Sequence, residues 1–307
     1  MDYTLRQLQI FLKITQKQSV TKASEALHLT QPAVSIQLKN FQEQFPIPLT
    51  EIVGRKLYVT DFGNEIALAA EKILEEVATI NFKTLAYQGE LSGRLLVSVV
   101  STAKYVMPYF LSDFMKANAG VELIMDVTNK SRVVKSLEGN EVDFALVSVL
   151  PKKLKVNRVE LMPNRLFYVA STDLKFKNKP TKKKLFEGMP LIYREEGSAT
   201  RNAMETFISK NKFSVRQKME LTSNEAVKQA VVSGLGCSIM PLIGIKHELR
   251  HKELQIVPVK GLPVTTAWNL IWLKSKKLSP AATAYLDFIT SKKEAIIKKD
   301  FSWIDSF

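Results

Sequence analysis

The segment from Ser19 to Phe45, "SVTKASEALHLTQPAVSIQLKNFQEQF", constrains the fold more than any other part of the chain. Apolar residues recur at helical spacing on both sides of "HLT", which predicts two short amphipathic helices joined by a tight turn. Pro32 fits the first turn of the second helix, because no intrahelical N–H bond is needed there. A preceding periodic run predicts another helix, capped by Thr4 and ending near Gln18.

A small β-hairpin is predicted next, at 49–60, where "LTEIVGRKLYVT" places "VGRK" at the tip. Three helices followed by a hairpin form a winged helix-turn-helix, in which the N-terminal end of the last helix enters the DNA major groove. Gln31 lies at that end, and glutamine can pair bidentately with adenine. The outward candidates for DNA contact are Thr30, Gln31, Pro32, Ser35, Ile36 and Lys39. Ordinary amphipathic helices can produce part of this pattern, which leaves a purely structural interpretation open.

A long helix without proline is predicted from Asp61 to Tyr87. A seam of residues alternates four and three apart along it: Ile66, Ala70, Ile73, Val77, Ile80, Thr84 and Tyr87. This spacing is typical of a short coiled coil, although a helix packed on its own domain is the alternative. Because the preceding domain is too small to cover a helix of this length, we expect a dimer helix.

The chain changes character after the turn-rich segment "QGELSGR" at 88–94. Apolar strand-like runs then alternate with helical patterns, which predicts a parallel α/β sheet arranged as two subdomains. The expected boundaries are 1–60 for the DNA-binding domain, 61–88 for the linker helix and 89–307 for the third domain. Within the third domain, we expect one subdomain at about 89–164 and 268–300 and the other at about 165–267.

The sequence "LRQLQIFLKI…SVTKASEALHLTQPAVSIQLKNFQ", followed by "PLTEIVGRKLYVTDFG", resembles the LysR-type transcriptional regulators, and the resemblance covers the whole chain. The segments "LHLTQPAVS", "GRKLYVTDFG" and "VVSTAKYVMP" are most similar to regulators of carbon-fixation (RuBisCO) operons. The resemblance implies a multidomain protein with a winged helix-turn-helix, a linker helix and a periplasmic-binding-protein-like effector domain. It also implies that Arg55, helped by Lys56, contacts the minor groove or the DNA backbone.

Two positions depart from the family pattern. After the wing's Pro-Leu the family usually has Phe and then Glu-Arg, whereas this chain has Thr50, Glu51 and Ile52. Many members carry Arg where this chain has Ile36. Thr50 leaves the packing of the wing open, and Ile36 removes one cationic contact with DNA.

Hydroxyl and cationic side chains follow several predicted strands of the third domain. Ligands in open α/β sheets lie beyond the C-terminal ends of strands, and the resemblance implies a cleft between the subdomains. The candidates for effector contact are Ser101, Thr102, Lys104, Ser148, Arg194, Ser198 and Thr200, with Arg201 nearby. Hydroxyls and helix N-terminal amides favour a small anion such as a carboxylate or phosphate. The alternative is plain helix capping, since Ser and Thr are preferred there without a ligand.

The net charge of +14 does not by itself locate a nucleic-acid site. Residues 1–88 carry nine basic and nine acidic side chains, so the excess lies entirely in 89–307. The N-terminus lacks the apolar run of a signal peptide, and the single Cys237 fits a reducing compartment, which predicts a cytoplasmic protein. We expect no membrane span, because no run approaches 18 apolar residues.

Other functions compete with a regulator. The sequence "HELRH" at 247–251 matches the His-Glu-x-x-His pattern of zinc hydrolases, but it lies on a short predicted helix. A free-standing solute-binding protein would account for the C-terminal half alone. We expect no enzyme activity, cofactor or metal. The partners expected are double-stranded operator DNA, a small anionic effector, and further copies of the chain as a homodimer through the linker helix and a homotetramer.

Overall fold

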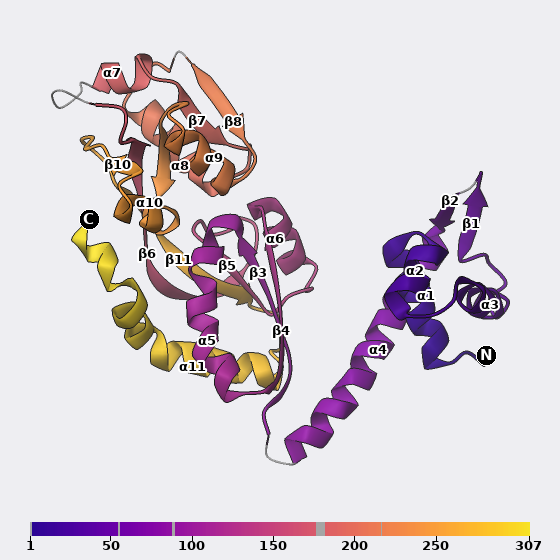
Figure 1. Ribbon diagram of the computed structural model, residues 1–307. Helices are drawn as coiled ribbons and strands as arrows, with labels where there is room; N and C mark the ends of the chain where they lie inside the picture. Colours follow the sequence, from indigo (N-terminus) through magenta and orange to yellow (C-terminus); the bar gives the residue numbers. More distant parts are fainter. Residues whose placement is uncertain (1, 55, 88–89, 176–181, 216) are drawn as a thin grey trace. The chain divides into compact units, whose positions relative to one another are not determined.

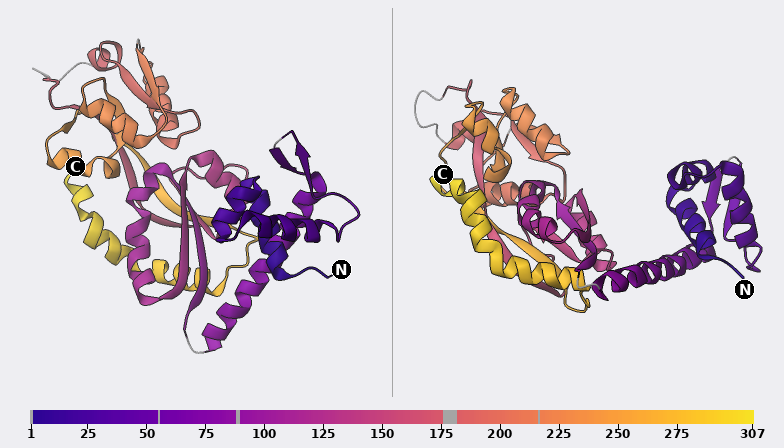
Figure 2. Two further views of the ribbon diagram at one scale, coloured as in Figure 1. Left: turned by 45° about the vertical axis from the view of Figure 1, so that its right-hand side comes forward. Right: turned by 60° about the horizontal axis from the view of Figure 1, so that its bottom comes forward.

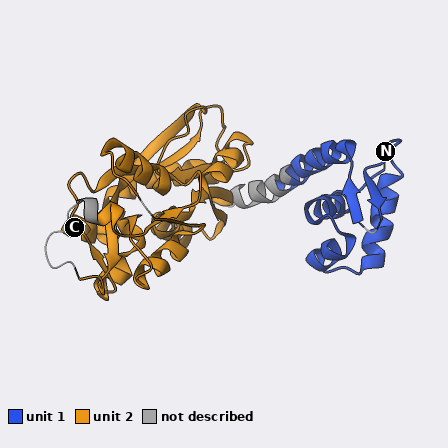
Figure 3. Ribbon diagram, turned by 90° about the horizontal axis from the view of Figure 1, so that it is seen from above, with its two compact units in different colours: residues 1–90 blue, residues 91–307 orange. Residues whose placement is uncertain are grey.

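The computed structural model describes residues 2–54, 56–87, 90–175, 182–215 and 217–307. The chain divides into two compact units, 1–90 and 91–307 (Figure 3). Among the described helices, none is long and apolar enough to cross a membrane.

The helices of the first unit are α1 (Leu5–Lys17), α2 (Val20–Leu27) and α3 (Gln31–Gln42), which confirms the three predicted helices. Side chains cap the first two, because Thr4 accepts from the Gln7 N–H and Ser19 accepts from the Lys22 N–H. His28 ends α2 with a left-handed φ of 52° and so turns the chain into α3. The helices enclose the buried side chains of Phe11, Ala23, Val34 and Phe41, whereas Ala26 is exposed.

The wing is the predicted hairpin, formed by β1 (Thr50–Val53) and β2 (Lys56–Val59) in antiparallel register. Thr50 joins it to the end of α3. Its hydroxyl donates to Gln42 Oε1 at 2.8 Å, and its backbone N–H reaches the same oxygen at 3.2 Å. At Thr50, where the sequence departs from the family pattern, a polar link therefore joins wing and helix.

The linker helix α4 spans Asp61–Tyr87, as predicted. Thr60 caps it, because its Oγ1 accepts from the Gly63 N–H at 2.9 Å and donates to the Pro48 carbonyl at 2.7 Å. Glycine is required at 63, since an added Cβ would lie 2.0 Å from the Leu49 carbonyl oxygen.

The first half of α4 packs against its own domain. Ala70 is buried, and Ile66 packs against the same cluster as Phe11 and Phe41. Leu68 and Ile73 remain 60% and 41% exposed. The start of the seam is therefore buried in the domain, whereas Ile73, further along the seam, is exposed, and Leu68 is an exposed apolar side chain outside the seam. The side chains of Thr84 and Tyr87 lie outside the described residues.

The second unit is built on a sheet with the order β10-β6-β11-β5-β3-β4, with β9 also paired to β6 (Figure 1). Its strands are β3 (Ser92–Val100), β4 (Gly120–Thr128), β5 (Phe144–Val147), β6 (Val156–Ser171), β9 (Ser238–Pro241), β10 (Leu254–Ile256) and β11 (Val264–Leu273). β7 (Leu191–Arg194) and β8 (Lys218–Leu221) form a separate parallel pair. The predicted parallel pairing holds for β3, β4 and β5, whereas β6, β9, β10 and β11 pair antiparallel.

The helices of this unit are α5 (Met107–Ala117), α6 (Lys130–Glu138), α7 (Lys182–Glu187), α8 (Ala199–Lys210), α9 (Asn224–Val232), α10 (Lys246–Arg250) and α11 (Pro280–Ile296). Short turns of helix are η1 (Ser101–Tyr105), η2 (Leu242–Gly244), η3 (Ile297–Phe301) and η4 (Ser302–Ser306). η1 precedes α5 directly, and Pro108 lies in the first turn of α5.

The elements gather in two lobes joined by the long strands β6 and β11 (Figures 1 and 2). The first lobe holds β3, β4, β5, α5, α6 and α11, and the second holds α7 to α10 with β7 to β10. The first half of β6 was not predicted, because Pro163 interrupts its strand pattern. Pro163 is tolerated next to a β-bulge, where the β6–β11 register shifts between Trp268 and Asn269. The predicted subdomain boundaries, near 164/165 and 267/268, stay a prediction.

Candidate DNA-binding and ligand-binding sites

The N-terminal end of α3 presents the predicted DNA-contacting face. Thr30, Gln31 and Pro32 are exposed, and Ser35 is half-buried one turn later. Gln31 Nε2 donates to Ser35 Oγ at 2.8 Å, which ties the Gln31 amide to the helix surface. Its carbonyl oxygen and second N–H then remain for a partner. Thr30 makes no capping hydrogen bond, so its hydroxyl is not used in holding the helix end.

The same face continues along α3 with an apolar and a basic side chain. Ile36 is 57% exposed, although large apolar residues are usually buried. Lys39 pairs with Glu43 at 3.9 Å, and because both side chains are well exposed, this pair contributes little stability. On the wing, Lys56 is exposed, whereas Arg55 lies outside the described residues.

A small cavity lies where the strand ends of the second unit meet helix starts. It is lined by Val100, Ser101, Thr102, Asn129, Lys130, Arg194, Glu195, Ser198, Ala199 and Thr200. Five predicted effector residues, Ser101, Thr102, Arg194, Ser198 and Thr200, are thus brought together from two chain segments. The cavity measures about 20 Å³, which is enough for about one water molecule, so a metabolite needs it to open.

Arg194 is the central charge of this cavity and is only 4% exposed. Its guanidinium binds the neighbouring Glu195 carboxylate in a bidentate pair, with Nε–Oε2 and Nη2–Oε1 both at 2.7 Å. Nη2 also donates to Ser101 Oγ at 3.1 Å, which links the second lobe to the first. Arg201, which the sequence placed next to the candidate effector residues, donates from its Nη1 to the Arg194 carbonyl at 3.1 Å. The chain's own Glu195 carboxylate therefore already binds the Arg194 guanidinium, in the way that an anionic ligand would.

Helix capping does not account for all the hydroxyls at this cavity. Ser198 precedes α8 and is buried, yet its side chain makes no capping hydrogen bond. Asn129, which the sequence reasoning missed, does cap α6 by accepting from the Arg132 N–H at 3.0 Å. Asn129 directly follows β4, so the strand-end rule used for the other residues would also have found it.

Two of the predicted effector residues lie elsewhere. Lys104 pairs with Glu225 at 3.4 Å and lines a different, larger cavity. Ser148 is buried after β5 and lines neither of these two cavities. The sequence placed both at a strand end, but only side-chain packing decides which cavity a strand end faces.

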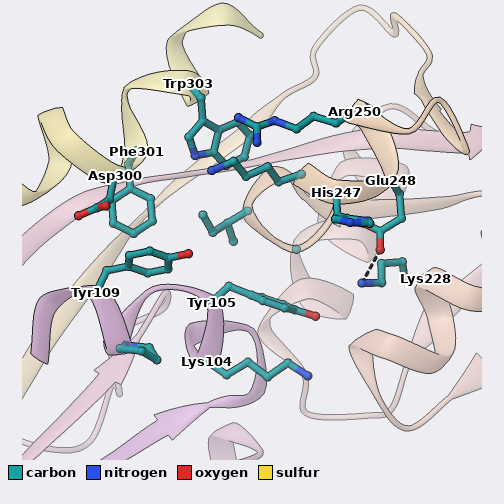
Figure 4. A pocket seen from close by; sticks show the side chains of 14 residues that line it. Lys104, Tyr105, Tyr109, Lys228, His247, Glu248, Arg250, Asp300, Phe301 and Trp303 are labelled. Atoms are coloured by element: carbon teal, nitrogen blue, oxygen red, sulfur yellow. Dashed lines mark ion pairs between the residues drawn. The ribbon is translucent and has the colours of Figure 1, made fainter. Parts of the chain in front are cut away.

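The larger cavity measures about 540 Å³ (Figure 4). It is lined by Lys104, Tyr105, Pro108, Tyr109, Lys228, Ile243, Gly244, Lys246, His247, Glu248, Arg250, Asp300, Phe301 and Trp303. Lys228 pairs with Glu248 at 2.8 Å and with Glu225 at 3.0 Å. Burial alone would lower the pKa of Lys228, but its hydrogen bonds to Glu248 and Glu225 outweigh burial and raise it.

The zinc-hydrolase pattern forms no metal site among the residues that the structure describes. Glu248 is buried and bound to Lys228, so its carboxylate is not free to act as a general base. Within the described ranges, no three His, Cys, Asp or Glu side chains lie close enough to hold a metal ion. Cys237 is fully buried, and burial raises the pKa of its thiol, which disfavours the reactive thiolate.

Comparison with known proteins matches both units. Residues 5–64 match the family "bacterial regulatory helix-turn-helix protein, lysR family", and residues 88–293 match the "LysR substrate binding domain". The RuBisCO operon transcriptional regulator of Allochromatium vinosum is 36% identical, over 95% of this chain and 97% of that protein. The HTH-type transcriptional activator CmpR of Synechocystis is 34% identical over the same shares.

Solved structures agree with these matches. The regulatory domain of Synechocystis CcmR, solved in complex with 2-PG, is 30% identical with a TM-score of 0.62, over 68% of this chain and 99% of that one. Full-length CbnR complexed with its target DNA shares the fold, with a TM-score of 0.71 at 18% identity, over 94% and 99% of the two chains. The similar curated proteins are regulators rather than enzymes. The chain therefore belongs to the LysR family of transcriptional regulators, and its resemblance to the RuBisCO-operon regulators is confirmed.

Proposed function

We propose that this chain binds operator DNA through α3 and the wing, and that a small anion entering the Arg194 cavity changes that binding. The observation that carries the effector site is the convergence of Ser101, Thr102, Arg194, Ser198 and Thr200 around one buried guanidinium. The CcmR regulatory domain, which resembles this unit, was solved with 2-PG, a small anionic metabolite. We therefore take 2-PG as the first effector to test.

The effector takes the place of Glu195. A carboxylate or phosphate group satisfies the Arg194 fork as well as Glu195 does, and it adds the hydroxyls of Ser101 and Ser198 as donors. Because the cavity is small, the two lobes must separate slightly, and the Arg194–Ser101 bond between them must give way or rearrange. Such a change is the conformational step that a ligand can pass on to the DNA-binding unit.

The DNA-binding form is a dimer, and we expect a tetramer made of two dimers. The exposed Leu68 and Ile73 supply apolar surface on α4 for a second copy of the helix. Two-fold symmetry of the protein would match a partly palindromic operator. We expect this assembly to work in the cytoplasm.

Binding to the DNA upstream of the chain's own gene tests the proposal. Fluorescence anisotropy of that DNA, with and without 2-PG, should show an affinity change that Arg194→Gln abolishes while leaving effector-free binding intact. A panel of small phosphates and carboxylates extends the test to other anions. The effector site is refuted if none of these anions shifts either thermal stability or DNA affinity.

A free-standing solute-binding protein was the alternative for the lobed unit, and the match of residues 5–64 to the lysR helix-turn-helix family favours the regulator instead. A solute-binding protein would bind the anion but would not retard its upstream DNA. A regulator should bind that DNA with an affinity that falls steeply as salt rises.

A further inference from the structure

The larger cavity has the size and composition of a ligand site that the proposed function does not use. Its volume of about 540 Å³ falls in the range typical of small-molecule sites, roughly 300–1,000 Å³. Four separate segments form it: the end of η1 with the start of α5, α9, η2 with α10, and the C-terminal turns η3 and η4. It is therefore built from both lobes and from the last residues of the chain.

Among the described residues, two of the four Lys and Arg side chains that line this cavity have no carboxylate at ion-pairing distance. Lys104 and Lys228 are paired with Glu225 and Glu248. Lys246 and Arg250, one turn apart on α10, form no ion pair within 4.0 Å among the described residues. Asp300 is the acidic side chain that faces them across the cavity.

The positive charges of Lys246 and Arg250 repel each other. Burial, together with the charge of Arg250, lowers the pKa of Lys246 despite the opposing effect of Asp300. Like charges at this helical spacing destabilise a helix, and a bound anion would relieve the repulsion.

Aromatic rings form the rest of the wall. Tyr105 and Tyr109 come from the first lobe, and Trp303 comes from the C-terminal turn (Figure 4). The Lys246 ammonium lies 4.7 Å from the centre of the Trp303 ring, and Figure 4 shows the Arg250 guanidinium reaching toward the same ring. Planar surfaces and free cations therefore lie side by side at one edge of the cavity.

We propose that this cavity is a second ligand site, which takes a small organic anion with a planar ring. The ring packs between Trp303 and the tyrosines, and the anionic group binds Lys246 and Arg250. The site is separate from the Arg194 cavity, but η1 joins them, since Ser101 and Thr102 line one cavity and Lys104 and Tyr105 the other.

The probe for the test is 8-anilinonaphthalene-1-sulfonate, a planar anion that fluoresces when it leaves water. Full-length protein should bind one molecule per chain saturably. The double variant Lys246→Gln, Arg250→Gln should bind about tenfold more weakly or worse, because two charge-assisted contacts are lost. The matched control Lys292→Gln, Lys298→Gln removes two exposed charges from the neighbouring C-terminal helices and should bind like the parent chain.

Two further variants distinguish ring packing from charge and this cavity from the smaller one. Trp303→Leu should weaken the probe without changing the net charge, and Arg194→Gln should leave it unaffected. The proposal is overturned if the parent chain shows no saturable site, or if the Lys246, Arg250 double variant binds as tightly as its control. A probe lost only in Arg194→Gln would assign the binding to the smaller cavity and also overturn it.

Discussion

Gln31 and Ser35 act as a pair on the exposed face of α3. The hydrogen bond between them restricts the Gln31 amide before DNA arrives, so less side-chain freedom is lost on binding. Gln31→Ala should cost ~1–3 kcal/mol of specific affinity and relax the base preference at one position. Ser35→Ala should change the same preference by less. Competition titrations with operator variants measure both effects.

Lys56→Ala is the control for that experiment. A phosphate contact carries no base information, so its loss should weaken binding to every sequence alike and reduce the salt slope by about 1. If Gln31→Ala also weakens all sequences equally, the amide does not read bases and the placement of the reading face is wrong.

Glu195 is the internal competitor of the anionic effector. Glu195→Gln keeps the shape of the side chain but removes the carboxylate from Arg194, so 2-PG should bind more tightly. Glu205→Gln is the matched control, because Glu205 pairs with Arg201 at 2.8 Å and does not line the cavity. Calorimetric titration measures both affinities. Weaker binding in Glu195→Gln would mean that this carboxylate contacts the effector instead of competing with it.

The wing and the linker helix meet where the backbone of Gly63 lies close to the carbonyl group of Leu49. Gly63→Ala should destabilise the DNA-binding unit by ~1–3 kcal/mol or more, since the methyl group would overlap the Leu49 carbonyl and force backbone shifts. Gly54→Ala at the wing tip should cost about 1–2 kcal/mol. An alanine there has room for its Cβ, but the left-handed φ of 65° strains its backbone. Urea unfolding of the two variants compares them, and a larger loss in Gly54→Ala than in Gly63→Ala would contradict the argument.

The exposed apolar surface of α4 around Ile73 is expected to hold the dimer. Ile73→Lys places a charge on that surface, so the dimer of the variant should dissociate at a higher protein concentration than the parent dimer does. Asn64→Lys adds the same charge to an exposed polar position of the helix and should leave assembly unchanged. Sedimentation equilibrium separates the two outcomes. A dimer that survives Ile73→Lys unchanged must be held by another surface.

Helical periodicity located α1 to α4 well, because buried apolar residues recur along one face of a helix, as Val34 and Phe41 do on α3. The strand-end rule found five of the ten residues that line the Arg194 cavity, since parallel strands present their C-terminal ends at one edge. The larger cavity was not predicted, because Trp303 and Lys246 meet only after the chain folds back from η4 to α10. Likewise, the Arg194–Glu195 pair depends on side-chain geometry that neighbouring positions in the sequence do not reveal.

The basic excess of the molecule lies entirely in residues 89–307, outside the DNA-binding domain and the linker helix. Residues 1–88 have no net charge, so operator affinity must come from a few positioned contacts rather than from a basic surface. Residues 89–307 carry the entire +14, which raises the local concentration of small anions around both cavities.

Coupling between the effector and DNA sites must act in both directions. If 2-PG changes operator affinity by some factor, the operator must change 2-PG affinity by the same factor, because both are legs of one thermodynamic cycle. The Arg194–Ser101 hydrogen bond between the lobes is the contact expected to carry the change. Ser101→Ala should therefore reduce both the effect of 2-PG on operator affinity and the effect of the operator on 2-PG affinity, so that both factors approach 1. Ser148→Ala should change neither factor. Titrating 2-PG with and without operator, and operator with and without 2-PG, measures the four affinities, and factors unchanged in Ser101→Ala would exclude this contact from the coupling.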